Sequence, residues 1–140
     1  MVVLGGRLEE RSGLGLGCMS VSGQYNNGVP LDRESALEFF RGVYDAGTRH
    51  FDTAEVYKSG PLFAPATDDT IYNESQLGWF FATVPRGSFT VATKYMPLSR
   101  NNDCSYEIVK TALLASLARL GLSYVDLYYS HAVPSCEAGV

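Results

Sequence analysis

Strand-like segments recur along the chain at the spacing of β–α–β units, with helix-like segments between them. The four apolar, β-rich segments are LGLGCMS (14–20), TRHFD (48–52), FTVATKY (89–95) and SYVDLYYS (123–130). Parallel strands need a crossover of a dozen or more residues, usually a helix, and such crossovers are right-handed. The spacing therefore predicts an α/β fold of about four βα units with parallel strands.

The segments between these strands have the periodicity and boundary residues of amphipathic helices. The first helix is predicted to begin after Asp32, a good N-cap residue, and to end at Gly47. The last is predicted from about Ser105 to Gly121, with apolar residues on one face. Each helix should therefore pack one face against the sheet.

The middle helix is predicted from near Asn73 to a break at Pro85, because Asn73 and Gln76 have the spacing of a capping box. Residues 58–72, which precede it, contain two prolines and no apolar periodicity. We expect this segment to be a long loop.

Two architectures fit this order of elements: a doubly wound open sheet, or part of a (β/α)8 barrel, whose full form needs about 250 residues. A dinucleotide-binding open sheet should carry GxGxxG at the start of a helix. Here Gly13, Gly15 and Gly17 form GxGxG inside a predicted strand. The match is poor, but glycines alone decide little, and both architectures stay open at this point.

Composition excludes several classes of protein. The chain has 140 residues, 46% of them hydrophobic, which suits one domain over residues 1–140. No apolar run has the length of a membrane span or a signal peptide, so we expect a cytoplasmic protein. The net charge of −4 is interspersed, which does not suit nucleic acid as a partner. Cys18, Cys104 and Cys136 are widely spaced and predict neither a disulfide framework nor a metal site.

Ionisable residues follow the predicted strands at the points where these end. Asp52 closes the second strand and Tyr57 lies in the loop after it. Lys94 lies near the end of the third strand, and His131 directly follows the fourth. Each residue alone is more often a packing or solvated side chain. Because the carboxyl ends of parallel strands converge on one face, however, the four together predict a shared site.

Five segments, in this order and at these spacings, resemble the first half of the aldo-keto reductase barrel, particularly its microbial and plant branches: LGLGCM, HFDTAEVY, NESQLG, VATKY and YYSHAVP. The resemblance covers about residues 8–134. It implies the N-terminal half of a (β/α)8 TIM barrel and an enzyme that transfers hydride from NADPH to a small aldehyde or ketone. The catalytic tetrad that it implies is Asp52, Tyr57, Lys94 and His131.

The resemblance also implies cofactor contacts near the nicotinamide, at Gly17, Cys18, Met19 and Asp52. Many family members have threonine and tryptophan or tyrosine where this chain has Cys18 and Met19. Packing at the strand end is therefore the favoured interpretation of these two side chains.

The four residue types suit carbonyl reduction on chemical grounds. Hydride addition leaves a developing alkoxide, which needs a proton donor within reach. Tyr57 can supply the proton, and we expect the Lys94 ammonium to lower its pKa from the ordinary value of about 10. Asp52 should hold Lys94 charged and oriented. His131 should direct the substrate carbonyl.

A complete family barrel has eight strands, whereas this sequence reaches the fourth. The resemblance places most contacts to the cofactor's phosphates in the other half. We therefore expect a truncated chain that is inactive alone and that self-associates through open barrel edges. Three functions stay open: a reductase represented by its catalytic half, a non-catalytic binding or regulatory module of the same fold, and a non-functional fragment.

Overall fold

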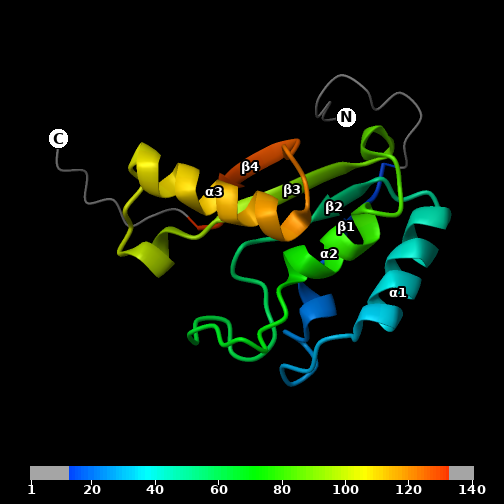
Figure 1. Ribbon diagram of the computed structural model, residues 1–140, viewed down its shortest axis with the longest axis horizontal. Coiled ribbons are helices and arrows are strands. Elements are labelled where there is room, and N and C mark those ends of the chain that lie inside the picture. Colours follow the sequence, from blue (N-terminus) through cyan, green and yellow to red (C-terminus); the bar gives the residue numbers. More distant parts are fainter. Residues whose placement is uncertain (1–12, 133–140) are drawn as a thin grey trace.

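A computed structural model describes residues 13–132. Four strands form one parallel sheet in chain order: β1 (Gly15–Gly17), β2 (His50–Asp52), β3 (Thr90–Tyr95) and β4 (Leu127–Ser130). Three α-helices connect them and lie along one side of the sheet (Figure 1): α1 (Arg33–Asp45), α2 (Asn73–Phe81) and α3 (Tyr106–Leu120). Short 3-10 helices follow β1 and flank β3: η1 (Met19–Ser22), η2 (Arg86–Ser88) and η3 (Pro97–Arg100). The predicted α/β fold with four parallel strands is confirmed.

All four strands are shorter than the predicted segments, and the difference is largest for β1 and β4. β1 ends at Gly17, because the backbone at Cys18 already has helical angles and η1 follows it. β4 begins only at Leu127, because the carboxylate of Asp126 accepts the Val91 N–H at 2.9 Å where a strand would offer a backbone carbonyl. Apolar patterning records neither the backbone change at Cys18 nor the cross-strand bond of Asp126, so it makes both strands too long.

The predicted ends of α1 and α3 are confirmed. A carboxylate oxygen of Asp32 accepts the Ser35 N–H at 2.8 Å and so caps α1. Gly121 ends α3 in the left-handed conformation, with φ of 66°, which glycine adopts without strain. The predicted loop over residues 58–72 is also confirmed, and an antiparallel bridge between Lys58 and Tyr72 joins its ends.

The predicted capping box at the start of α2 is wrong. The Asn73 amide instead donates to the Cys18 carbonyl at 2.8 Å and accepts from the Thr53 hydroxyl at 2.6 Å. The Gln76 amide donates to the Leu31 carbonyl at 2.8 Å. Both side chains are completely buried. They bind distant segments of the chain because burial leaves them no water to bind.

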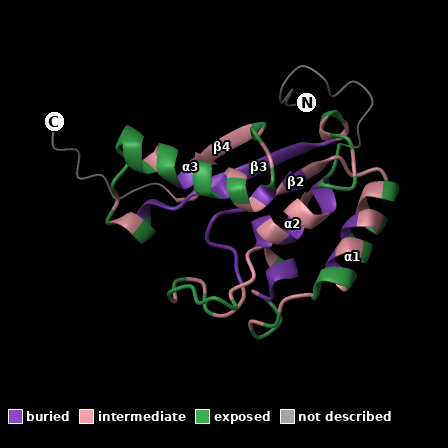
Figure 2. Ribbon diagram, viewed as in Figure 1, coloured by how far each residue is buried: buried purple, intermediate pink, exposed green. Residues whose placement is uncertain are grey.

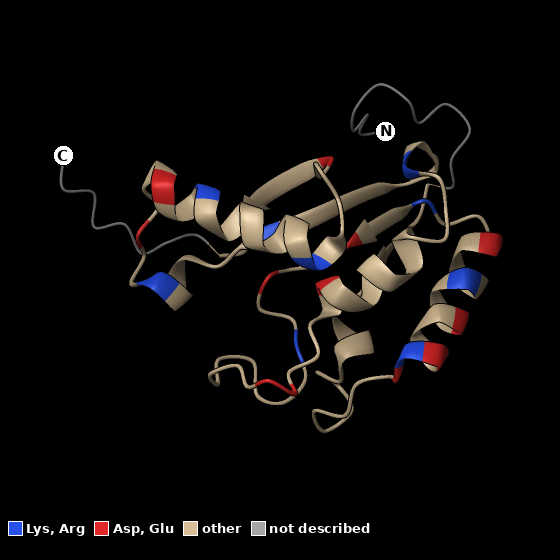
Figure 3. Ribbon diagram, in the orientation of Figure 1, with Lys and Arg blue, Asp and Glu red and all other residues tan. Residues whose placement is uncertain are grey.

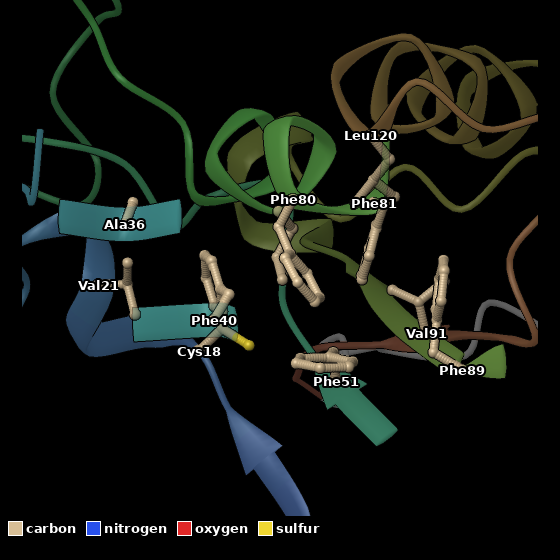
Figure 4. Close-up of a cluster of buried hydrophobic side chains, with 11 residues drawn as sticks. Cys18, Val21, Ala36, Phe40, Phe51, Phe80, Phe81, Phe89, Val91 and Leu120 are labelled. Atoms are coloured by element: carbon tan, nitrogen blue, oxygen red, sulfur yellow. The ribbon is translucent and has the colours of Figure 1, made fainter. Parts of the chain in front are cut away.

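Aromatic rings fill the space between the sheet and its helices (Figure 4). Phe51 of β2 contacts Phe40 of α1 and Phe80 and Phe81 of α2, with ring centroids 5.5–6.3 Å apart. Phe81 stacks on Phe89 with centroids 4.1 Å apart. Rings of this size bury much apolar area and prefer such offset and edge-on contacts. This cluster therefore supplies much of the force that holds α1 and α2 against the sheet.

Burial is uneven across the other elements. All of β3 is buried, whereas the outer side of α3 is exposed (Figure 2). Of the apolar face predicted for α3, Ala112 and Leu120 are buried but Ile108 is 37% exposed. Acidic and basic residues are interspersed along α1, as on a solvated helix surface (Figure 3). Over residues 13–132, every helix is too short or too polar to cross a membrane.

α2 and α3 approach so closely that only glycine fits between them. A Cβ atom added at Gly78 of α2 would lie 2.6 Å from the Arg119 carbonyl oxygen and 3.0 Å from that of Leu120. Both atoms belong to the backbone of α3 and cannot rotate away. By contrast, a Cβ atom added at Gly42 of α1 would meet nothing within 4 Å.

We therefore expect Gly78→Ala to lower the free energy of unfolding by about 1–3 kcal/mol, because the methyl group forces the helices apart. Gly42→Ala is the matched control and should raise that free energy by about 0.5–1 kcal/mol through helix propensity alone. Urea unfolding followed by circular dichroism measures both variants. Equal stabilisation of the two would contradict the close packing of α2 on α3.

Candidate active site

The four residues predicted to share a site lie together at the carboxyl ends of β2, β3 and β4. The Lys94 ammonium donates to Oδ1 of Asp52, as a salt bridge, and to the Thr53 carbonyl at 2.7 Å. Its nitrogen lies 4.9 Å from the centre of the Tyr57 ring. The Tyr57 hydroxyl oxygen lies 3.4 Å from Nε2 of His131, with the two rings nearly perpendicular. The four side chains thus form one continuous cluster.

The register of the sheet explains this convergence. Asp52 pairs with Ala92, and Lys94 lies two residues further along β3 on the same face. His131 continues the ladder past β4, since its N–H donates to the Tyr95 carbonyl at 2.7 Å. The loop after β2 then brings Tyr57 back toward both.

The electrostatics of the cluster differ from the sequence prediction at Tyr57. Burial, and then the negative charge of Asp52, raise the pKa of Tyr57 above its ordinary value. The predicted lowering by Lys94 is therefore wrong for this structure. The Lys94 ammonium lies over the face of the ring and is paired with Asp52, whose charge opposes its effect on the hydroxyl. At neutral pH Tyr57 is consequently a protonated phenol.

Burial lowers the pKa of His131 from its ordinary value, and the positive charge of Lys94 lowers it further. The imidazole is therefore neutral at pH 7. A neutral imidazole donates a hydrogen bond from one nitrogen and accepts one at the other. His131 can thus share a proton with the Tyr57 hydroxyl without adding a charge to the cluster.

The residues predicted to contact a cofactor have three different surroundings. Gly17 is exposed and pairs with Asp52 in the sheet. A Cβ atom added at Gly17 would meet nothing within 4 Å. Cys18 is completely buried in the aromatic core, and burial raises the pKa of its thiol. Met19 is partly buried against the small cluster that contains Tyr57.

These surroundings leave open space beside Gly17, next to Asp52 in the sheet. They leave the Cys18 side chain to packing, the interpretation that the sequence favours. Over residues 13–132, no three His, Cys, Asp or Glu side chains lie together in a way that could hold a metal ion.

Tyr129 also belongs to the cluster, although the sequence prediction did not include it. Its hydroxyl donates to Oδ2 of Asp52 at 2.6 Å, and its ring centre lies 5.4 Å from the Lys94 ammonium. The sequence could have indicated this position for Tyr129, because side chains of the last strand alternate between the two faces of the sheet with a period of two residues. That alternation puts Tyr129 on the face opposite to its neighbour Tyr128.

A cavity of about 330 Å³ lies elsewhere, between the 58–72 loop, η3 and the end of α3. Its lining includes Glu55, Arg100 and Arg119 but none of the four predicted site residues. Glu55 pairs with Arg100 at 2.7 Å, and Arg119 pairs with Glu74 of α2 at 2.6 Å. The first pair joins the segment after β2 to η3, and the second joins α3 to α2, so we assign both pairs to structure.

Comparisons with known proteins agree with the fold and with the family resemblance. The sequence pattern of the aldo/keto reductase family matches residues 13–136. A probable aldo-keto reductase 1 from Glycine max is 33% identical over 137 residues, which cover 94% of this chain and 36% of that protein.

Two solved structures have the same fold. A thermostable aldo-keto reductase in complex with the inhibitor epalrestat matches with a TM-score of 0.66 and 26% identity, over 93% of this chain and 42% of that one. An aldo-keto reductase complexed with NADPH matches with a TM-score of 0.56 and 25% identity, over 83% of this chain and 31% of that one. The four strands and three α-helices therefore correspond to part of a (β/α)8 barrel, as the family resemblance implies.

The chain spans between 31% and 42% of the length of these three proteins. Within that span, the family pattern, the parallel sheet and the order of the motifs all agree. The chain belongs to the aldo/keto reductase family.

Proposed function

We propose that this chain carries the catalytic residues of an NADPH-dependent reductase of small aldehydes or ketones. The observation that carries the proposal is the contact of Tyr57, Lys94, Asp52 and His131 in one cluster. A nicotinamide cofactor is supported by family membership and by the NADPH complex of a structural relative. The open space beside Gly17 suits the nicotinamide end of that cofactor.

NADPH, when bound, supplies the hydride that reduces the carbonyl carbon. Tyr57 then donates its proton to the carbonyl oxygen as negative charge develops there. Its raised pKa keeps it protonated at neutral pH, which suits a proton donor. His131 lies close enough to the Tyr57 hydroxyl to hydrogen-bond the same substrate oxygen and so hold it in place.

Lys94 and Asp52 act on Tyr57 rather than on the substrate. As Tyr57 loses its proton, the ammonium 4.9 Å from its ring offsets part of the destabilisation that burial and the charge of Asp52 impose on the phenolate. Asp52 holds this ammonium in place through Oδ1. We place the reaction in the cytoplasm, which suits the free thiols of Cys18 and Cys104.

Tyr57→Phe should lower the rate of carbonyl reduction by about 10²–10⁴-fold while NADPH affinity changes little, because the ring stays and the proton donor is lost. The assay uses a hybrid barrel in which residues 13–136 replace the matching segment of the thermostable relative. Tyr128→Phe is the matched control, since Tyr128 lies on the other face of the sheet. Turnover of 4-nitrobenzaldehyde by Tyr57→Phe at the control rate would show that Tyr57 serves only in packing.

NADPH binding without turnover in the unmutated hybrid would instead favour the non-catalytic module.

The pH dependence of the same hybrid follows from the raised pKa of Tyr57. Reduction needs the protonated phenol, so kcat should stay level from about pH 7 to about pH 10 and fall only above it. The reverse oxidation of an alcohol needs the phenolate, so its rate should rise in the range above about pH 10 where reduction falls. Stopped-flow pH jumps measure both directions before the protein unfolds. A fall in reduction centred near pH 7 would show that another group supplies the proton.

The purified 140-residue chain by itself should neither bind NADPH saturably nor turn over 4-nitrobenzaldehyde. Holding reactants in attack geometry supplies several kcal/mol or more of a barrier, and the family resemblance places most contacts to the cofactor's phosphates outside the matched segment. We also expect the chain to associate through β1 and β4, the outer strands of the described sheet. Calorimetric titration, a turnover assay and analytical ultracentrifugation test these points. Tight binding with turnover would show that the chain rebuilds a working site.

A further inference from the structure

Tyr129 and Lys94 are direct neighbours in the register of β3 and β4, and both side chains lie on the face that carries the site. The Tyr129 hydroxyl donates to Oδ2 of Asp52 at 2.6 Å, while Lys94 donates to Oδ1. The two oxygens of one carboxylate are thus held from two sides by two different strands. A carboxylate with one donor can pivot about its side-chain torsion, whereas one with two donors cannot do so without breaking a bond.

The Lys94 ammonium lies between two aromatic rings as well. Its nitrogen is 4.9 Å from the centre of the Tyr57 ring and 5.4 Å from that of Tyr129. Both distances allow a cation–π attraction. Tyr129 therefore contacts the ammonium through its ring and reaches the ammonium's counter-ion through its hydroxyl.

We propose that Tyr129 is a positioning residue, whose hydroxyl holds Oδ2 of Asp52 so that Oδ1 stays directed at Lys94. The charged groups that face Tyr129 are Asp52 on β2 and Lys94 on β3. Burial, and then the hydrogen bond to Asp52, raise the pKa of the Tyr129 hydroxyl. It therefore keeps its donor proton over the whole neutral range. The catalytic consequence, steady support of Tyr57 by Lys94, rests on the proposed function, but the contact itself does not.

The adjacent residue provides a matched control. Tyr128 pairs with Thr93 and points to the opposite face of the sheet. Within residues 13–132, its buried hydroxyl oxygen has no hydrogen-bond partner. Tyr128→Phe and Tyr129→Phe thus remove the same atom from adjacent positions of one strand, but only the second removes a bond to Asp52.

Hydrogen exchange of the lysine ammonium groups tests the proposal in the 140-residue chain without cofactor or substrate. The lysines are Lys58, Lys94 and Lys110, so the NMR spectrum is simple to assign. Tyr129→Phe should accelerate exchange of the Lys94 ammonium by about tenfold or more, because loss of a hydrogen bond to a charged group frees Asp52 to move. Lys58, which is buried and donates to the Pro61 carbonyl, should keep its rate, whereas general unfolding would accelerate both. Tyr128→Phe should leave the Lys94 rate within about twofold of that of the unmutated chain.

A Lys94 rate in Tyr129→Phe equal to that in Tyr128→Phe would overturn the proposal. If Tyr129→Phe does not fold, titration of the ¹³Cζ signal of Tyr129 gives a second test. Asp52→Asn removes a charge that raises the pKa of Tyr129, so Tyr129 should ionise at lower pH in that variant. An unchanged titration would also overturn the proposal. Neither measurement needs turnover, so an inactive hybrid would count against the proposed function alone.

Discussion

The position of the site depends on a buried amide at the start of α2. Asn73 accepts a hydrogen bond from Thr53 at 2.6 Å and donates one to the Cys18 carbonyl at 2.8 Å. Thr53 directly follows Asp52, and Cys18 directly follows Gly17. One side chain at the start of a helix therefore fixes the carboxyl ends of two neighbouring strands. Because a buried amide that loses a partner costs about 1–3 kcal/mol, this arrangement is strongly preferred over any shift of either strand end.

The next residue of α2 does the same for the third strand. Glu74 is completely buried, accepts from the Thr93 hydroxyl at 2.6 Å and pairs with Arg119 of α3 at 2.6 Å. Thr93 directly precedes Lys94, so the carboxylate fixes the backbone from which the site's ammonium extends. Removing Arg119 would leave the completely buried charge of Glu74 uncompensated, which is destabilising. The motif NESQLG, which carries much of the family resemblance, thus has a structural role: it holds the strands that carry the candidate site in register.

The sequence predicted most of the fold because its signals are local. Strand spacing, the cap at Asp32 and the terminator Gly121 each depend on residues close together in the chain, and the structure contains all three. The capping box predicted at Asn73 is also a local signal. However, the Asn73 side chain is buried and binds Thr53 and Cys18, which are distant in the sequence, in place of local backbone groups. Likewise, the late start of β4 follows from a cross-strand bond of Asp126. Errors therefore lie where tertiary hydrogen bonds replace local ones.

The same distinction applies to the site. The carboxyl ends of parallel strands meet on one face, a rule that needs only the order of elements. It predicts that the side chains at these ends should meet: Asp52, Tyr57, Lys94 and His131. The protonation of Tyr57 and the role of Tyr129 depend instead on cross-strand register. The ammonium lies over the face of the Tyr57 ring, and burial, followed by the negative charge of Asp52, raises the Tyr57 pKa. For the proposed reduction this is favourable, because a phenol that stays protonated in the resting site is ready to donate its proton.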